Sequence, residues 1–245
     1  MIYLGVLFSL GGSLVFWAFM RRAPSWLIAV TSVAAALCTQ FAIPGPDRTQ
    51  VLYSPMIRVL LIPGHTNMLM VLYPVVPWLG VTGLGLLFGR LLQRDAHRAG
   101  RVAFWTGLGL LILFAVVRAL GGFGNLNGVP SGWMGFLNVV KYPPSLAFLA
   151  VTLGINLFLV ASWSRFEPHL RSPYHPLVAF GRAALCFYLL HLWVYGFLGL
   201  LFRAGSGLVS MYAFWLLGLG ILYPFCYWYN RFKQRKPPDS IWRFF

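Results

Sequence analysis

Histidines, rather than carboxylates, are the residues of this sequence that could do acid–base chemistry. The only acidic residues, Asp47, Asp95, Glu167 and Asp239, lie outside the long apolar runs. Paired-carboxylate catalysis, carboxylate proton relays and acidic metal sites would all need an Asp or Glu within those runs. His191 does lie within one, in Tyr188-Leu-Leu-His191-Leu-Trp193. It is the candidate catalytic residue, because an imidazole exchanges a proton near neutral pH.

Two interpretations of His191 stay open, since a histidine in an apolar run can also bond a neighbouring helix and serve packing alone. His65, in Pro63-Gly64-His65-Thr66-Asn67 at the mouth of another run, is a second candidate, for substrate binding. The three cysteines stand in separate runs with no C-x-x-C spacing. The sequence therefore predicts neither a metal site nor a disulfide framework.

Two arginines lie at or within apolar runs, where a charge costs about 2.5–3.5 kcal/mol at the bilayer centre. Arg118 stands near the outer end of its run and Arg182 near the cytoplasmic start of another. Arg182 is the candidate for binding phosphate groups of a cofactor, because a guanidinium fits phosphate. Each arginine has an alternative role, which is to extend to the lipid headgroups.

A third cation, Lys141, opens the segment Lys141-Tyr-Pro-Pro-Ser145 at the end of a long loop. The two prolines stiffen the chain before a helix, and Ser145 can cap that helix. With Arg118 and Asn138, Lys141 is predicted to form a cationic outer pocket for a substrate.

The elements that must position these residues are transmembrane helices. The chain is 59% hydrophobic and 9% charged, against roughly 25% charged residues in soluble domains. Its apolar residues form runs of about 18–25, the length that spans a bilayer. There are seven: Ile2–Met20, Trp26–Ile43, Leu69–Leu92, Val102–Leu120, Ser145–Ser162, Leu177–Phe202 and Gly207–Tyr227. We predict an all-α polytopic bundle over residues 1–230 and a basic cytoplasmic tail over residues 231–245.

The basic residues indicate the orientation of this bundle. Thirteen lie in alternate loops and the tail, against five on the opposite side, and basic loops face the cytoplasm. The amino terminus is thus predicted outside and the carboxyl terminus inside. The net charge of +15 is explained by topology and headgroup contacts, so nucleic acid is not an expected partner, whereas the lipid bilayer is. Homo-oligomerisation is left open.

Three local patterns predict details of the bundle. The outer connections hold short apolar stretches, Met56–Ile62 and Trp133–Val140, which predict short helices. Glycines at small-xxx-small spacing in the third run, between Gly80 and Gly89, predict close helix contact. No internal repeat is evident.

Four blocks of residues resemble a known family. They are Tyr73-Pro74…Pro77-Trp78-Leu-Gly80-Val; Arg118 at the end of its helix; Phe136-Leu-Asn138-Val-Val-Lys141-Tyr-Pro-Pro-Ser145-Leu; and Phe180-Gly-Arg182…Tyr188-Leu-Leu-His191-Leu. In this order, over about Leu69–Leu192, they are similar to a bacterial multipass family of unknown function related to the heparan-alpha-glucosaminide N-acetyltransferase catalytic domain.

The resemblance implies acetyl transfer across a bacterial inner membrane. The donor would be acetyl-CoA from the cytoplasm, a histidine would take part in the transfer, and the acceptor would be a sugar or glycan on the outer side. The family's usual first stretch, Asp-x-x-Arg-Gly followed by a helix with a histidine, is not found here. We therefore expect a chain truncated at its amino terminus. The alternative function is a non-enzymatic membrane component, a transporter or assembly subunit for envelope glycans.

Overall fold

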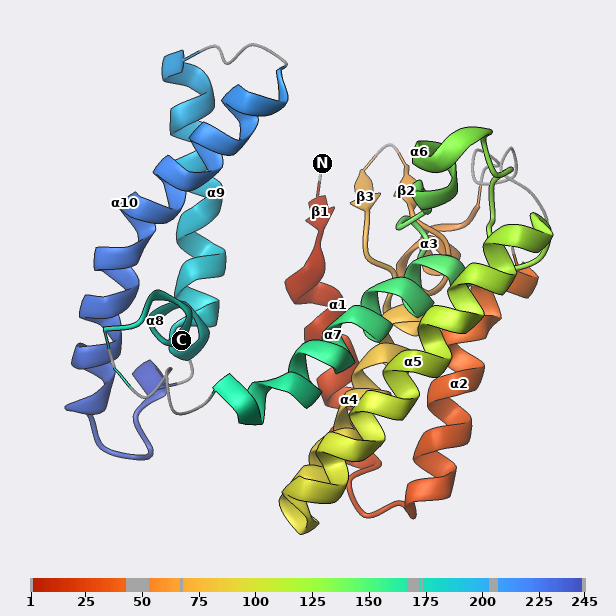
Figure 1. Cartoon of the computed structure of the whole chain (residues 1–245), viewed down its shortest axis with the longest axis horizontal. Coiled ribbons are helices and arrows are strands. Elements are labelled where there is room, and N and C mark those ends of the chain that lie inside the picture. The colour runs from red at the N-terminus through yellow and green to blue at the C-terminus, as the bar shows by residue number, and fades with distance from the viewer. Residues whose placement is uncertain are drawn as a thin grey trace. The chain divides into compact units, whose positions relative to one another are not determined.

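The structure is a computed structural model, and it describes residues 2–42, 53–66, 68–166, 172, 174–202 and 207–243. The chain divides into two compact units, Met1–Ser164 and Arg165–Phe245 (Figure 1). Each unit is described by itself below. Asp47, Glu167 and the basic residues Arg48, Arg171 and Arg203 lie outside the described residues.

The described residues contain five helices that are long and apolar enough to cross a membrane. They are α2 (Ser25–Ala42), α4 (Val75–Arg94), α5 (Ala96–Leu120), α9 (Ala184–Phe202) and α10 (Leu208–Gln234). Two further helices are α1 (Val6–Phe19) and α7 (Leu146–Phe166), whose apolar parts are shorter. In the five long helices, between 6% and 33% of the apolar window is buried, as suits helices that face lipid. The prediction of an all-α polytopic membrane protein is confirmed.

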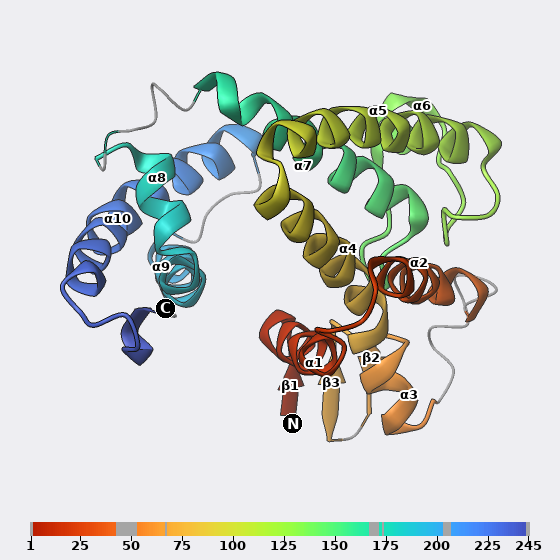
Figure 2. The ribbon, with the colours of Figure 1, turned by 90° about the horizontal axis from the view of Figure 1, so that it is seen from below.

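In the first unit, α4 packs against both α1 and α2 (Figure 2). A Cβ at Gly80 would lie 2.5 Å from the backbone oxygen of Ser32 and 2.6 Å from the backbone nitrogen of Ala36, both in α2. At Gly85, by contrast, a Cβ would meet nothing within 4 Å. The predicted close helix contact is therefore confirmed at Gly80 but does not extend to every glycine of α4.

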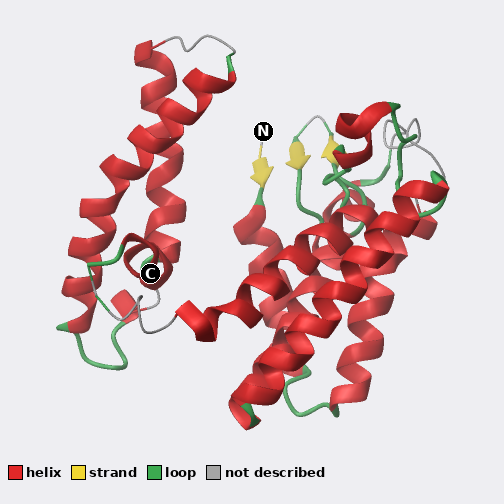
Figure 3. Cartoon of the chain, viewed as in Figure 1, coloured by secondary structure: helices red, strands yellow, loops and turns green. Residues whose placement is uncertain are grey.

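Two of the predicted spans begin later than expected, because their first residues are strands. The strands β1 (Ile2–Leu4), β2 (Gly64–His65) and β3 (Leu69–Val71) form a small sheet in the order β1-β3-β2 (Figure 3). Strand β1 is parallel to β3, and β2 is antiparallel to it. The residue before a proline avoids helical backbone, so Tyr73-Pro74 separates β3 from α4, with Pro74 at the N-cap.

The two short helices predicted in the outer connections are present. They are α3 (Pro55–Leu60) and α6 (Gly132–Leu137). Ser145 caps α7 as predicted, since its hydroxyl accepts a hydrogen bond of 3.0 Å from the amide of Phe148. In Figure 1 the three strands, α3 and α6 lie toward the same end of the first unit.

The second unit contains α8 (Pro176–Arg182), α9, α10 and a short 3₁₀ helix, Ile241–Arg243. The single span predicted over Leu177–Phe202 is broken at Ala183. The cause is α10: the Asn230 amide nitrogen donates a 2.7 Å bond to the carbonyl of Ala179, and the amide of Ala183 bonds the carbonyl of Phe180 instead. The helix α10 continues to Gln234, so the first residues of the predicted tail are helical.

Candidate functional site

Arg118 is buried at the end of α5, with 3% of its surface exposed. Its Nε donates to the carbonyl of Phe136 at 2.7 Å, and its Nη2 donates to the carbonyls of Gly135 and Asn138, the latter at 3.0 Å. The fourth acceptor is Oδ1 of Asn125, at 2.7 Å. A helix leaves its last carbonyls unpaired, so Arg118 serves as a C-terminal cap for α6.

Asn125, which the sequence interpretation missed, connects this cap to the end of α5. It is 1% exposed, and its amide nitrogen donates to the carbonyls of Val117 and Gly122, at 2.8 and 3.2 Å. Gly121 ends α5 in the left-handed conformation, at φ +69°. The sequence signal that could have indicated Asn125 is a glycine followed by an asparagine just after the end of a helix.

Lys141 lies apart from this network, in a partly exposed cluster with three aromatic residues that we call the lysine–aromatic cluster: Tyr73, Trp78, Lys141 and Tyr142. The ammonium nitrogen is 5.7 Å from the ring centre of Tyr73 and 5.2 Å from that of Tyr142. The two phenol oxygens are 2.8 Å apart, within hydrogen-bond distance. The ring of Tyr73 also contacts Trp78, at 5.2 Å between centres.

The surroundings of the cluster raise the pKa of both Lys141 and Tyr73. Burial acts to lower the pKa of Lys141, but hydrogen bonding and charge interaction with Tyr73 and Tyr142 outweigh it, so the pKa lies above its usual 10.5. Burial and the bond to Tyr142 raise the pKa of Tyr73 above 10. The cluster thus offers a cation, two hydroxyls and aromatic faces, groups that can bind a sugar ring.

Gln40 is a second residue that the sequence interpretation missed. It lies in α2, is 6% exposed, and donates through Nε2 to the carbonyl of Pro144 at 3.0 Å. It therefore joins α2 to the segment that carries Lys141. Its Oε1 has no hydrogen-bond partner among the residues that the structure describes. The sequence signal that could have indicated Gln40 is a glutamine inside an apolar run, because a polar side chain within the membrane costs free energy.

The remaining candidate of the first unit, His65, is exposed in β2, where it pairs with Met70 of β3. Within the described ranges, no group of three His, Cys, Asp or Glu side chains could hold a metal ion. Of the three residues predicted to form the outer pocket, Arg118 and Asn138 are in contact, because Arg118 donates to the Asn138 carbonyl. Lys141 instead contacts the tyrosine rings of the lysine–aromatic cluster.

His191 lies in α9 of the second unit, surrounded by aromatic rings. Its ring is parallel to that of Phe187, at 5.7 Å between centres, and it also contacts Tyr188 and Tyr195. Its Nδ1 is 2.5 Å from the carbonyl oxygen of Tyr188. A carbonyl only accepts hydrogen bonds, so Nδ1 carries a proton, and Nε2 is the ring nitrogen left to act as a base.

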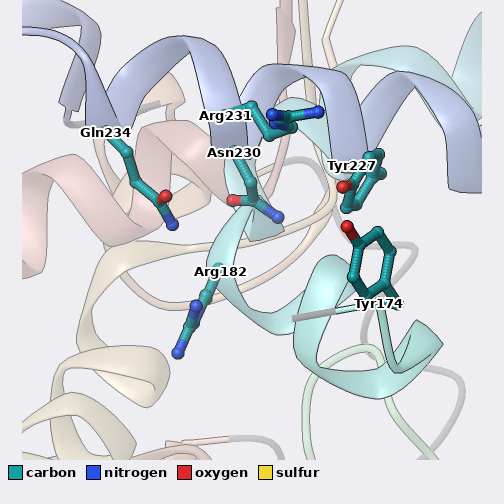
Figure 4. Close-up of a pocket in the computed structure, with 6 residues that line it drawn as sticks. All are labelled: Tyr174, Arg182, Tyr227, Asn230, Arg231 and Gln234. Carbon is teal, nitrogen blue, oxygen red and sulfur yellow. The ribbon is translucent and has the colours of Figure 1, made fainter. Parts of the chain in front are cut away.

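Arg182 lines a pocket of the second unit with a volume of about 210 Å³. The other lining residues are Tyr174, Tyr227, Asn230, Arg231 and Gln234 (Figure 4). Only Arg182 of this set was predicted as a site residue. The rest come from the segment before α8, which was predicted as a loop, and from the last turns of α10, which were predicted as the end of the last span and the start of the basic tail.

Part of the chain matches a known protein family. Residues 1–122 match the family model described as heparan-alpha-glucosaminide N-acetyltransferase, catalytic. The match includes the Tyr73–Val81 block and Arg118, and it ends before Lys141 and His191. Comparison with curated proteins and with solved structures gives no match. Through residues 1–122, this multipass membrane protein is therefore related to the heparan-alpha-glucosaminide N-acetyltransferase family.

Proposed function

We propose that this chain is a membrane acetyltransferase, which transfers an acetyl group from acetyl-CoA on the cytoplasmic side to a sugar or glycan on the outer side. The observation that carries the proposal is the family match over residues 1–122. The charge distribution of the loops supports the orientation, because basic loops stay in the cytoplasm. A bacterial inner membrane is the proposed location.

The acceptor side of the proposal lies in the first unit. Lys141 is the cation that contacts the acceptor, because it is exposed and flanked by aromatic faces. Arg118 has its bonds directed to α6 and Asn125, so its contribution is to hold the segment that carries Asn138. His65 lies on the exposed strand β2, at the end of the unit where α6 also lies (Figure 1).

The donor side is assigned to Arg182, whose guanidinium would bind the phosphates of acetyl-CoA. The chemical step is acyl transfer from a thioester. The amine or hydroxyl of the acceptor attacks the acetyl carbon, a C–N or C–O bond forms, and the C–S bond breaks. In the proposal, Nε2 of His191 takes the proton of the acceptor and returns it to the departing thiolate.

Binding of acetyl-CoA tests the proposal against the alternative of a non-enzymatic glycan transporter or assembly subunit. The purified chain in nanodiscs is titrated with acetyl-CoA by calorimetry. We expect saturable binding, with Kd within about the 1 μM–1 mM range usual for substrates. Absence of binding over that range, for protein with an intact melting transition, would reject the enzyme.

His191→Asn tests the assigned catalytic residue. An asparagine amide can occupy the position of Nδ1 and still donate to the carbonyl of Tyr188, but it offers no base. We expect unchanged protein abundance and acetyl transfer lowered by about 10²–10⁴-fold. His97→Asn, at an exposed position of α5, is the matched control and should transfer at the parent rate. Retention of transfer by His191→Asn would remove His191 from the mechanism.

A further inference from the structure

The pocket that contains Arg182 has the composition of an anion site. It receives two guanidinium groups, from Arg182 of α8 and Arg231 of α10. Asp239 is the one carboxylate among the described residues of this unit, and it does not line the pocket. The Arg182 side chain makes no hydrogen bond to any residue that the structure describes, and Arg231 stacks on Tyr227 at 6.0 Å. Each guanidinium group is therefore available to a phosphate, which a planar guanidinium fits geometrically.

Asn230 gives the pocket a second, independent feature. The residue is 6% exposed, and its Oδ1 has no hydrogen-bond partner within the described part of the chain. The orientation of the amide is determined by the bond from Nδ2 to the Ala179 carbonyl, because a carbonyl cannot donate. A buried acceptor without a partner is unfavourable. We therefore expect Oδ1 to accept a hydrogen bond from a bound ligand.

The remaining lining residues limit the part of a ligand that fits. The rings of Tyr174 and Tyr227 are stacked, at 5.3 Å between centres and 26° between planes. Figure 4 shows this pair on one side of Asn230 and Gln234 on the other. The volume of about 210 Å³ is below the roughly 300–1,000 Å³ of pockets for whole small molecules. The pocket thus accommodates the polar end of a larger molecule.

We propose that this pocket binds a phosphate ester carrying an N–H or O–H group, with a phosphate on Arg182 or Arg231 and the donor group on Oδ1 of Asn230. Two sources have this chemistry: the nucleotide end of the acyl donor and the headgroup of an anionic phospholipid. The inference stands on the pocket alone, so it holds whether or not the chain transfers acetyl groups.

The test uses the full chain in nanodiscs and two probes. The first probe is adenosine 3′,5′-bisphosphate, titrated in phosphatidylcholine discs. The second is phosphatidylglycerol, measured by its retention on the purified protein in native mass spectrometry. We expect at least one probe to bind, and the Arg182→Gln/Arg231→Gln variant to weaken that binding by about tenfold or more. The control Arg235→Gln, at an exposed position outside the pocket, should stay within about twofold of the parent.

A competition arm identifies the source. If phosphatidylglycerol in the discs weakens nucleotide binding, lipid and nucleotide share the pocket. If nucleotide binding is unchanged, and retention of the lipid does not depend on the two arginines, the nucleotide is the ligand. Phosphatidylmethanol has the charge of phosphatidylglycerol but no hydroxyl, so a lipid ligand should prefer the latter. Equal effects of Arg182→Gln/Arg231→Gln and Arg235→Gln on both probes, at equal melting temperature, would overturn the proposal.

Discussion

Replacing Arg118 by lysine keeps the charge at the end of α5 but removes the planar fork of donors. Arg118 donates to four acceptors, three of which are carbonyls at the end of α6. Lysine has three N–H donors on a single nitrogen, so at least one of the four bonds is lost. At about 1.5 kcal/mol for each bond from a charged donor, the cap weakens by at least about 1.5 kcal/mol.

Hydrogen exchange measures this loss where it occurs. A change of about 1.5 kcal/mol raises the population of the opened segment by roughly tenfold, so peptides covering residues 132–138 should exchange roughly tenfold faster, or more, in Arg118→Lys. Arg98→Lys, an exposed position of the same helix, should leave these peptides unchanged. If Arg118→Lys also exchanges like the parent, Arg118 does not hold α6, and the assignment of its role is wrong.

Two other predictions concern the lysine–aromatic cluster and the contact between α2 and α4. In the Tyr73→Phe/Tyr142→Phe variant, the interactions that raise the pKa of Lys141 are removed, whereas burial, which lowers this pKa, remains. The pH at which labelling of the Lys141 amine is half-maximal, measured by mass spectrometry, should therefore decrease. An increase of this pH would contradict the assigned cause of the pKa shift. Gly80→Ala would place a Cβ 2.5 Å from the α2 backbone and should destabilise the protein by about 1–3 kcal/mol in thermal melting. Gly85→Ala, where the space is open, should be neutral or stabilising by up to about 1 kcal/mol, and equal losses for the two variants would refute the packing argument.

The spans could be predicted because each is a continuous apolar run, and continuity is a local property of the sequence. The strands could not be separated from the helices by the same criterion, since Ile2–Leu4 and Leu69–Val71 are as apolar as the helices that come after them in the chain. Their state depends on pairing between Ile2 and Leu69, which are far apart in the chain. The break at Ala183 likewise depends on Asn230, 51 residues from its acceptor.

The site residues divide in the same way. Histidine, lysine and arginine in apolar surroundings are visible as unusual residue types, and Lys141 and Arg182 could be chosen as candidates for that reason. The partners of Arg118 were not visible, because they are mostly backbone carbonyls 17–20 residues away, and every residue has one. With only four carboxylates in the chain, carbonyls become the usual acceptors for its cations, as with Arg90, which bonds the carbonyls of Arg21 and Ala23.

Acetyl transfer across a bilayer tests the central claim most directly. The chain is reconstituted in vesicles, sorted by orientation, with labelled acetyl-CoA supplied only on the side of the Gln93–Gly100 loop and a glucosamine-terminated glycan only on the other side. The account predicts that labelled acetyl appears on the glycan in parent vesicles, and that His191→Asn vesicles give about 10²-fold less or lower. Two results would contradict the account. Intact parent vesicles could bind acetyl-CoA but form no labelled glycan, or the parent and His191→Asn vesicles could form equal amounts of it.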